Sequence, residues 1–168
     1  LRRPAGSIFL SDASLQRDNE PINRPQPNLQ VTAPVVDAQQ RAHDIMMVDI
    51  DLEKLFRQLA ADLPPGLRLY LLNGRGDYLI HPEPARAFAF ARGQRANVLD
   101  EHPQAKALFE APGQRVDEQV SHSTDGHVAA FARQPATEAR LETTFIVGLS
   151  QPLAEVAAEG ERLGLSVL

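Results

Sequence analysis

Six residues have side chains suited to holding a small ligand, and we predict them as the ligand-binding residues: Asp49, Arg68, Tyr70, Tyr78, His81 and Arg92. An arginine can hold a ligand carboxylate through two parallel hydrogen bonds. Tyrosine and histidine can form a pocket wall, because each combines a ring face with a polar atom. Asp49 lies in the apolar run IMMVDID, where a carboxylate on the inner face of a sheet is costly unless it has a partner, such as a ligand ammonium group.

Two of these residues also have a structural interpretation. Asp49 can face solvent or form an ion pair within the fold. His81 can be hydrogen-bonded at the end of a strand, without touching a ligand. The sequence leaves both interpretations open.

Metal binding and catalysis have weaker sequence support. His122, Asp125 and His127 flank the TDG turn, and two imidazoles with a carboxylate can hold a metal ion. Such residues are more often solvated neighbours of a turn, so we predict no metal site. We find no serine in a nucleophile-elbow context and no phosphate-binding glycine loop before a helix. We therefore expect this chain not to be an enzyme and to carry no cofactor.

The tripeptide Arg75-Gly76-Asp77 lies between two apolar runs, LRLYLLN and YLIHP. Displayed on a loop, this tripeptide can serve as an adhesion signal. The flanking runs require a chain reversal here, however, and the two glycines of GRGD supply the backbone freedom for it. We predict that the tripeptide is the turn of a β-hairpin.

The composition limits the possible partners. The chain has 168 residues with a net charge of −5, and an acidic balance argues against binding to nucleic acid. It has no cysteine, which excludes disulfides and thiolate chemistry. No stretch approaches the roughly 20 apolar residues of a membrane span. The abrupt start, LRRPAGSIFL, reads like a piece cut from a longer protein.

The first half of the chain predicts a hairpin followed by a helix. Residues 28–36 alternate as a strand does, and 42–50 read as a second strand after the polar turn 37–41. The prolines of 16–27 predict a loop. Asp51 can cap the next helix, which PPG (64–66) ends. The spacing of its apolar residues predicts one buried stripe formed by Leu52, Leu55, Phe56, Leu59 and Leu63.

The second half predicts a sheet and a final helix. A hairpin over 67–82 precedes an irregular segment, a short helix within 104–112 that turns Leu108 and Phe109 inward, and a second hairpin around TDG. A strand over 143–150 leads into a helix over 152–168, with Pro152 at its first position. Its apolar residues could form one seam: Leu153, Val156, Leu163 and Val167. This order predicts an α+β fold, an antiparallel sheet flanked by helices with a C-terminal exit helix.

Four segments together resemble the Cache (extracytoplasmic PAS-like) sensor domains of bacterial transmembrane receptors, such as sensor histidine kinases, diguanylate cyclases and chemoreceptors. They are GSIFLSDASLQRDNEPINRPQPNLQVTAPVVD, MMVDIDLEKLFRQL, LYLLNGRGDYLIHPEP and FIVGLSQPLAEV. The chain departs from the family pattern in QQRAHDIMM, which lacks the glycine usual near the start of the second strand.

The resemblance implies a PAS/Cache-like sheet and a sensing function. Residues 1–50 would be the closing strands of a membrane-distal lobe, or the N-terminal part of a single lobe. Residues 51–66 would be a connecting helix, 67–150 the membrane-proximal lobe, and 151–168 the exit helix toward the membrane. We expect a periplasmic domain of an inner-membrane receptor that binds a small molecule and could form a homodimer, with transmembrane segments outside this chain. The alternative is a periplasmic protein–protein interaction domain with no small-molecule ligand.

Overall fold

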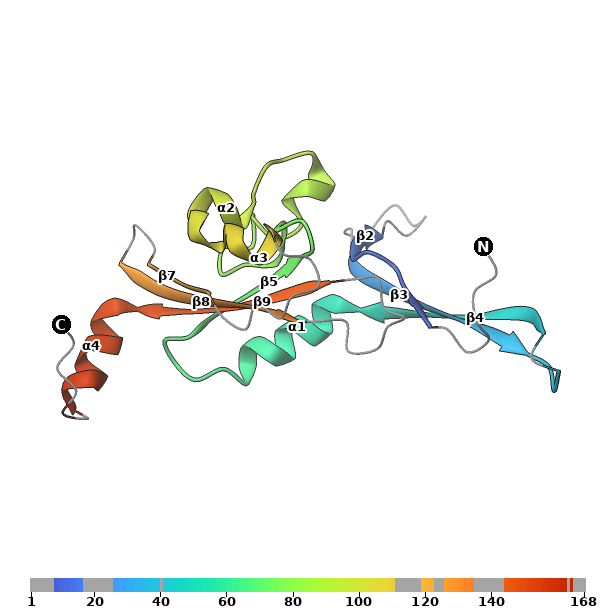
Figure 1. Cartoon of the computed structure of the whole chain (residues 1–168), viewed down its shortest axis with the longest axis horizontal. Coiled ribbons are helices and arrows are strands. Elements are labelled where there is room, and N and C mark those ends of the chain that lie inside the picture. The colour runs from blue at the N-terminus through green and yellow to red at the C-terminus, as the bar shows by residue number, and fades with distance from the viewer. Residues whose placement is uncertain are drawn as a thin grey trace.

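The computed structural model describes residues 8–16, 26–39, 41–110, 119–122, 126–134, 144–162 and 164. These residues form two antiparallel sheets that lie end to end along the long axis of the molecule, with short helices above the second sheet and one helix at the C-terminal end (Figure 1).

The first sheet is built around one long strand, β3 (Gln26–Val36). The short strands β1 (Phe9–Leu10) and β2 (Ser14–Gln16) pair with β3, and so does β4 (Ala42–Asp51). The predicted β3–β4 hairpin is therefore confirmed. The loop predicted over 16–27 was wrong at its ends, because Gln16 belongs to β2, and Gln26 and Pro27 belong to β3. Residues 17–25 lie outside the described residues. Pro27 lies opposite Leu15. A proline is tolerated in a strand where its missing N–H is not needed by a neighbouring strand.

Helix α1 (Leu52–Ala61) begins where predicted, because the Asp51 side chain accepts a hydrogen bond from the backbone N–H of Lys54. The predicted buried stripe was wrong in part. Leu52 is buried, but Leu55 and Leu59 are 42% and 45% exposed. The N-terminal turns of α1 pack against the core between the two sheets, and the later turns extend beyond that core.

The second sheet has the strand order β6-β5-β9-β8-β7. Its strands are β5 (Arg68–Asn73), β6 (Tyr78–Ile80), β7 (Gln119–His122), β8 (His127–Gln134) and β9 (Phe145–Pro152). The two predicted hairpins are confirmed as β5–β6 and β7–β8. The central strand β9 pairs with both, so the hairpins join into one sheet.

The connection between β6 and β7 covers one face of this sheet. It contains η1 (Ala89–Arg92), α2 (Val98–Glu101), η2 (Pro103–Lys106) and α3 (Ala107–Glu110). The predicted short helix is confirmed in α3, where Leu108 is fully buried and Phe109 packs against the core. The core beneath this cap consists of Tyr70, Leu72, Tyr78, Val98, Ala105, Leu108, Ala129, Phe131 and Ile146.

A second core connects the two sheets. Leu29 of β3 and Leu52 of α1 are buried with Leu79 of β6, and Leu71 and Phe145 pack around them. Because successive residues of a strand point to opposite faces, Leu71 reaches this core while its neighbours Tyr70 and Leu72 lie under the cap.

Helix α4 (Leu153–Arg162) follows β9 directly. Pro152 is the last residue of the strand and not the first of the helix. Leu153 and Val156 are exposed, whereas Leu163 and Val167 lie outside the described residues, so half of the predicted seam is seen. No helix in the part of the chain that the structure describes is long and apolar enough to cross a bilayer.

Candidate functional site

The turn of the β5–β6 hairpin is a rigid, docked structure. The Asn73 side-chain oxygen accepts hydrogen bonds from the backbone N–H groups of Arg75 (2.9 Å) and Asp77 (3.0 Å). Gly76 is buried with φ +84°, a left-handed conformation that favours glycine. Asn97 also donates to the Arg75 carbonyl and to the Asp77 carboxylate. The prediction of a hairpin turn is confirmed.

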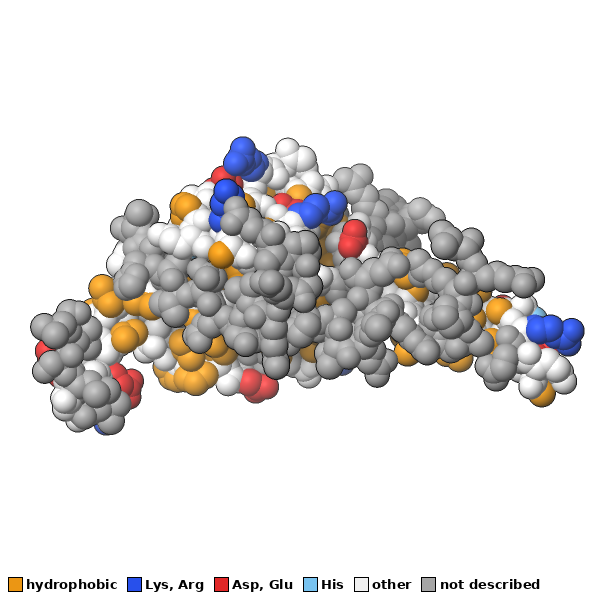
Figure 2. Space-filling view, in the orientation of Figure 1, with side chains coloured by type: hydrophobic (Ala, Val, Ile, Leu, Met, Phe, Trp, Pro, Cys, Tyr) orange, Lys and Arg blue, Asp and Glu red, His pale blue; other side chains and the backbone are white. Residues whose placement is uncertain are grey.

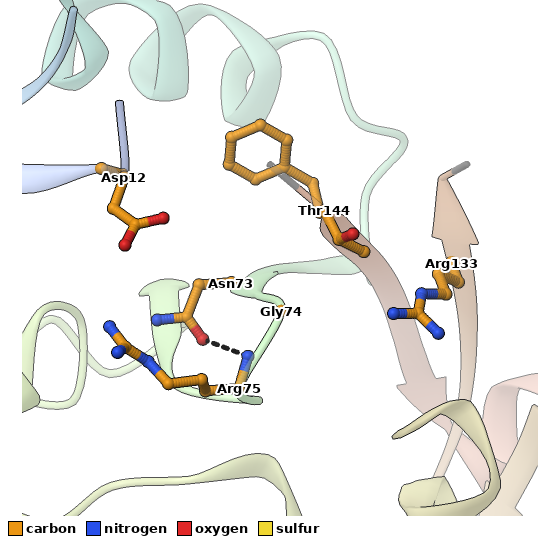
Figure 3. Close-up of a pocket in the computed structure, with 8 residues that line it drawn as sticks. Asp12, Asn73, Gly74, Arg75, Arg133 and Thr144 are labelled. Carbon is orange, nitrogen blue, oxygen red and sulfur yellow. Dashed lines mark hydrogen bonds between the residues drawn. The ribbon is translucent and has the colours of Figure 1, made fainter. Parts of the chain in front are cut away.

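A cavity of about 200 Å³ lies beside this turn, where the two sheets meet (Figure 3). The loop between β1 and β2 contributes Asp12 and Ala13, and the hairpin turn contributes Asn73, Gly74 and Arg75. The end of β8 contributes Arg133, and the start of β9 contributes Thr144 and Phe145. Four separate parts of the chain thus build one cavity.

The cavity lining carries charges of both signs. In Figure 3 the Asp12 carboxylate and the Arg133 guanidinium lie on opposite sides of the cavity, with the Asn73–Arg75 turn between them. Arg133 is oriented by a hydrogen bond from its Nη1 to the Leu108 carbonyl oxygen (3.1 Å). The Arg75 side chain is 70% exposed, and its Nε lies 3.7 Å from an Asp77 oxygen. Such a lining suits a small polar ligand.

Three of the predicted ligand-binding residues come together elsewhere, beneath the cap of the second sheet. The ring of His81 lies 4.5 Å from that of Tyr78 and 5.3 Å from that of Tyr70, measured between centroids. The Tyr70 ring also lies 5.9 Å from Phe131, and Ser150 donates to the Tyr70 hydroxyl at 3.2 Å. Tyr70 and Tyr78 are buried, so these rings form part of a packed core.

His81 is held at the end of β6 by two hydrogen bonds. Its Nδ1 accepts from the backbone N–H of Glu83 (2.9 Å), and its Nε2 lies 3.4 Å from a Glu101 oxygen. Because this ring is only 7% exposed, the geometry matches the structural interpretation of His81.

Glu101 is the charged centre of this region. Burial acts to raise the pKa of Glu101, but the interactions of its carboxylate with His81 and Arg86 outweigh burial, so the pKa is lowered. Arg86 bridges Glu101 and Glu83 through its guanidinium. Burial, followed by the nearby Glu101 carboxylate, raises the pKa of Tyr78. The Tyr78 hydroxyl is buried and has no hydrogen-bond partner among the described residues.

The remaining three predicted residues lie apart from these rings. Asp49 is exposed on β4, and its carboxylate accepts hydrogen bonds from the Asn28 and Gln30 side chains at 3.3 and 3.2 Å. Asp49 therefore has partners within the fold, which matches its structural interpretation. Arg92 donates to the Ala85 carbonyl (2.5 Å), and Arg68 is exposed at the start of β5. A ligand contact by any of the six residues stays a prediction.

The possible metal ligands fall largely outside what the structure describes. Asp125 and the side chain of His122 lie outside the described residues. Among the described residues, no group of three or more histidine, cysteine, aspartate or glutamate side chains is arranged to hold a metal ion.

Sequence reasoning missed two charged residues that line the cavity, Asp12 and Arg133. The sequence did contain a signal for Arg133. It lies two and four residues after Phe131 and Ala129 of β8, so its side chain is on the same face as these two buried residues. A charged residue on the buried face of a strand indicates a polar partner or a site. Asp12 had no such signal, since its position depends on the pairing of β1 and β2 with β3, which a short polar segment does not reveal.

The fold of this chain is similar to that of several solved structures. No protein-family model matches the chain, and no curated protein matches it. Among solved structures, the periplasmic sensory domain of the Campylobacter jejuni chemoreceptor Tlp1 is similar, with 17% identity and a TM-score of 0.60 over 89% of this chain and 50% of that one. The ligand-binding domain of the Pseudomonas aeruginosa PAO1 amino acid chemoreceptor PctB, in complex with L-Arg, has 14% identity and a TM-score of 0.56 over 94% and 62%.

A third similar structure is the ligand-binding domain of the Pseudomonas fluorescens chemoreceptor CtaA in complex with L-isoleucine, with 16% identity and a TM-score of 0.57 over 91% of this chain and 55% of that one. The chain thus spans half to about three fifths of the length of these structures. The prediction of an α+β fold, with antiparallel sheets and a C-terminal helix, is confirmed, and this fold is shared with these solved domains.

Proposed function

We propose that this chain is the extracytoplasmic ligand-sensing region of a bacterial signal-transduction receptor, and that it binds a small molecule without transforming it. The observation that carries this proposal is the match of about nine tenths of the chain to the fold of periplasmic sensory domains. A charged cavity where the two sheets meet gives such a ligand a place to bind.

The geometry supports a relay through β9. Phe145 at the start of this strand lines the cavity, and the other end of the strand runs into α4 without a loop. A ligand that contacts residues of both sheets can favour one arrangement of the sheets over another, by as much as its affinity for the two arrangements differs. We propose that α4 carries this change toward the membrane.

The β3–β4 hairpin supports the assignment of residues 1–50 to a membrane-distal lobe. Its edge strand β4 exposes four consecutive apolar residues, Ile45, Met46, Met47 and Val48, which point alternately to both faces. Strands that are apolar on both faces are typical of the interior of a sheet with both sides covered. We propose that further strands of a distal lobe cover β4 in the whole receptor.

A thermal-shift screen of small polar molecules tests the sensing function. A ligand at a hundredfold excess over its Kd should stabilise the folded chain by about 2.7 kcal/mol. For a chain of this length we expect a rise in Tm of about 5–10 °C. If no small molecule raises the Tm, the sensing function is wrong.

Exposed apolar residues favour a second candidate function, a periplasmic protein-interaction domain. Figure 2 shows hydrophobic side chains at the surface beside α4 and along the β3–β4 hairpin, and the exposed residues include Leu55, Leu59, Leu153 and Val156. The same screen separates the two functions, because an interaction domain should bind none of the small molecules.

A further inference from the structure

We infer that residues 83–97 form a strap that connects the cap helices α2 and α3 with the core between the two sheets, so that a shift of the cap also changes how the sheets pack on each other. The anchor of this strap is Phe88. The inference goes beyond the proposed sensing function and does not depend on it, because it concerns how two parts of the fold move together.

The strap passes around the outer edge of the second sheet. Strand β6 lies at one end of the strand order, and its neighbouring side chains point to opposite faces: Tyr78 lies under the cap, and Leu79 lies in the core between the sheets. At this edge the backbone N–H of Phe88 donates to the Tyr78 carbonyl oxygen at 2.8 Å. Directly after the strap, the N–H of Val98 donates to the Gly76 carbonyl oxygen at 2.9 Å. The chain is therefore held beside β6 at two points.

The two ends of the strap belong to different cores. Phe88 is only 2% exposed and belongs to the core between the sheets, together with Leu29 of β3 and Leu52 of α1. Phe90 packs against the same core, and its ring centroid lies 5.8 Å from that of Phe88. Val98, in contrast, is fully buried in the core under the cap. Because protein cores are closely packed, a segment that joins two of them transmits a displacement from one to the other.

The backbone of Phe88 indicates that tertiary contacts determine its position. Its φ of +53° and ψ of +27° are left-handed, a conformation that bulky residues rarely adopt. A residue keeps such a conformation only where the surrounding structure imposes it. Here the support comes from the burial of the ring and from the hydrogen bond to Tyr78. Release of the ring relieves this strain, which lowers the cost of moving the strap away from the core.

A polar contact ties the beginning of the strap to the cap. The guanidinium of Arg86 pairs with Glu101 of α2 and with Glu83. Arg86 precedes Phe88 by two residues, so the contact with the cap and the anchor in the core between the sheets are adjacent in the chain. A movement of α2 therefore reaches Phe88 through a short, continuous piece of structure.

Hydrogen exchange measured by mass spectrometry on the whole 168-residue chain tests this coupling. Phe88→Ala removes the anchor, whereas Phe109→Ala makes the same change in α3, where the ring packs against the core under the cap. Relative to the amides of β8, exchange in β3 and α1 should become about tenfold faster in Phe88→Ala and change less than about twofold in Phe109→Ala. Phe88→Leu, a milder change that keeps an apolar side chain, should shift the same amides in the same direction by a smaller factor.

The coupling should also act in the opposite direction. Leu29→Ala changes the core between the sheets from the side of the first sheet, and Leu59→Ala makes the same substitution at an exposed position of α1. Relative to β8, exchange of the strap amides should become about tenfold faster in Leu29→Ala and change less than about twofold in Leu59→Ala.

Thermal unfolding tests the strained backbone of the anchor. Phe88→Gly should have a higher Tm than Phe88→Ala, because glycine adopts a φ of +53° without a steric cost. The reverse order would show that Phe88 is not a strained anchor.

Two exchange results would overturn the inference. If Leu29→Ala speeds exchange in β3 while the strap is unchanged, the strap moves independently of the sheets. If Phe88→Ala and Phe109→Ala give the same exchange pattern, Phe88 has no special role in joining the two cores. Neither result bears on the proposed sensing function, which the small-molecule screen tests separately.

Discussion

The substitution Gly148→Ala tests whether the capped face of the second sheet is a filled core. Gly148 lies in the central strand β9, opposite Tyr70 on one side and Phe131 on the other. A Cβ at this position would overlap the Phe131 ring and would lie 3.2 Å from the Tyr70 Cβ. Phe131 is fully buried, so its ring has no room to move away without shifting its neighbours.

Two effects of opposite sign determine the size of the change. Replacing glycine by alanine reduces the entropy of the unfolded chain and by itself stabilises a protein by about 0.4–1 kcal/mol. Overpacking a tight core costs typically 1–3 kcal/mol. Because the overlap involves a ring rather than the flexible end of a side chain, we expect the second effect to dominate, with a net loss of about 1–2 kcal/mol and a fall in Tm of about 2–8 °C.

Urea unfolding of matched variants measures this prediction. Gly74→Ala is the control, since a Cβ there would meet the Thr144 Cβ at an ordinary 3.5 Å. In the double variant with Phe131→Leu, the smaller side chain should relieve the overlap, so the combined cost should fall below the sum of the single costs by at least 0.5 kcal/mol. Equal stabilities of Gly148→Ala and Gly74→Ala would refute the reasoning, and would mean that this face retains space for a ligand.

Three further predictions concern the Glu101 carboxylate, the turn of the β5–β6 hairpin and the N-terminal cap of α1. Glu101→Gln should lower stability at pH 7 by about 1–2 kcal/mol, since it weakens the interactions with His81 and Arg86. The pKa of Glu101 is lowered in the folded state, so the ionised carboxylate contributes its full stabilisation above the unfolded pKa of 4.5 and loses it as the pH falls further. Urea titrations should therefore show that the stability difference between Glu101→Gln and the original chain shrinks below about pH 4. Gly76→Ala should cost about 1–3 kcal/mol by thermal unfolding because of its φ of +84°, and an unchanged Tm would contradict the docked turn. Asp51→Ala should cost about 1 kcal/mol by removing the cap of α1, whereas Asp51→Asn should retain most of it; equal losses would argue against the cap.

The sequence by itself determined the local elements of this protein. Alternating apolar residues predicted β3, because the period of two is a property of the strand itself, and two apolar runs on either side of GRGD predicted the β5–β6 hairpin. The cap at Asp51 and the reversal at GRGD also followed from the chemistry of a few adjacent residues. The order of these elements, together with the resemblance of four segments, was enough to predict the fold type.

Only the tertiary structure decided burial and the composition of the site. Leu52 and Leu59 belong to the same apolar stripe of α1, yet of these two only Leu52 is buried in the core between the sheets. Tyr70 and Tyr78 proved to be core residues, and the cavity brought together Asp12 and Arg133 from opposite ends of the chain. Periodicity predicts which residues share a face. Pairings between segments that are distant in the sequence decide which element covers that face and which charged residues meet there.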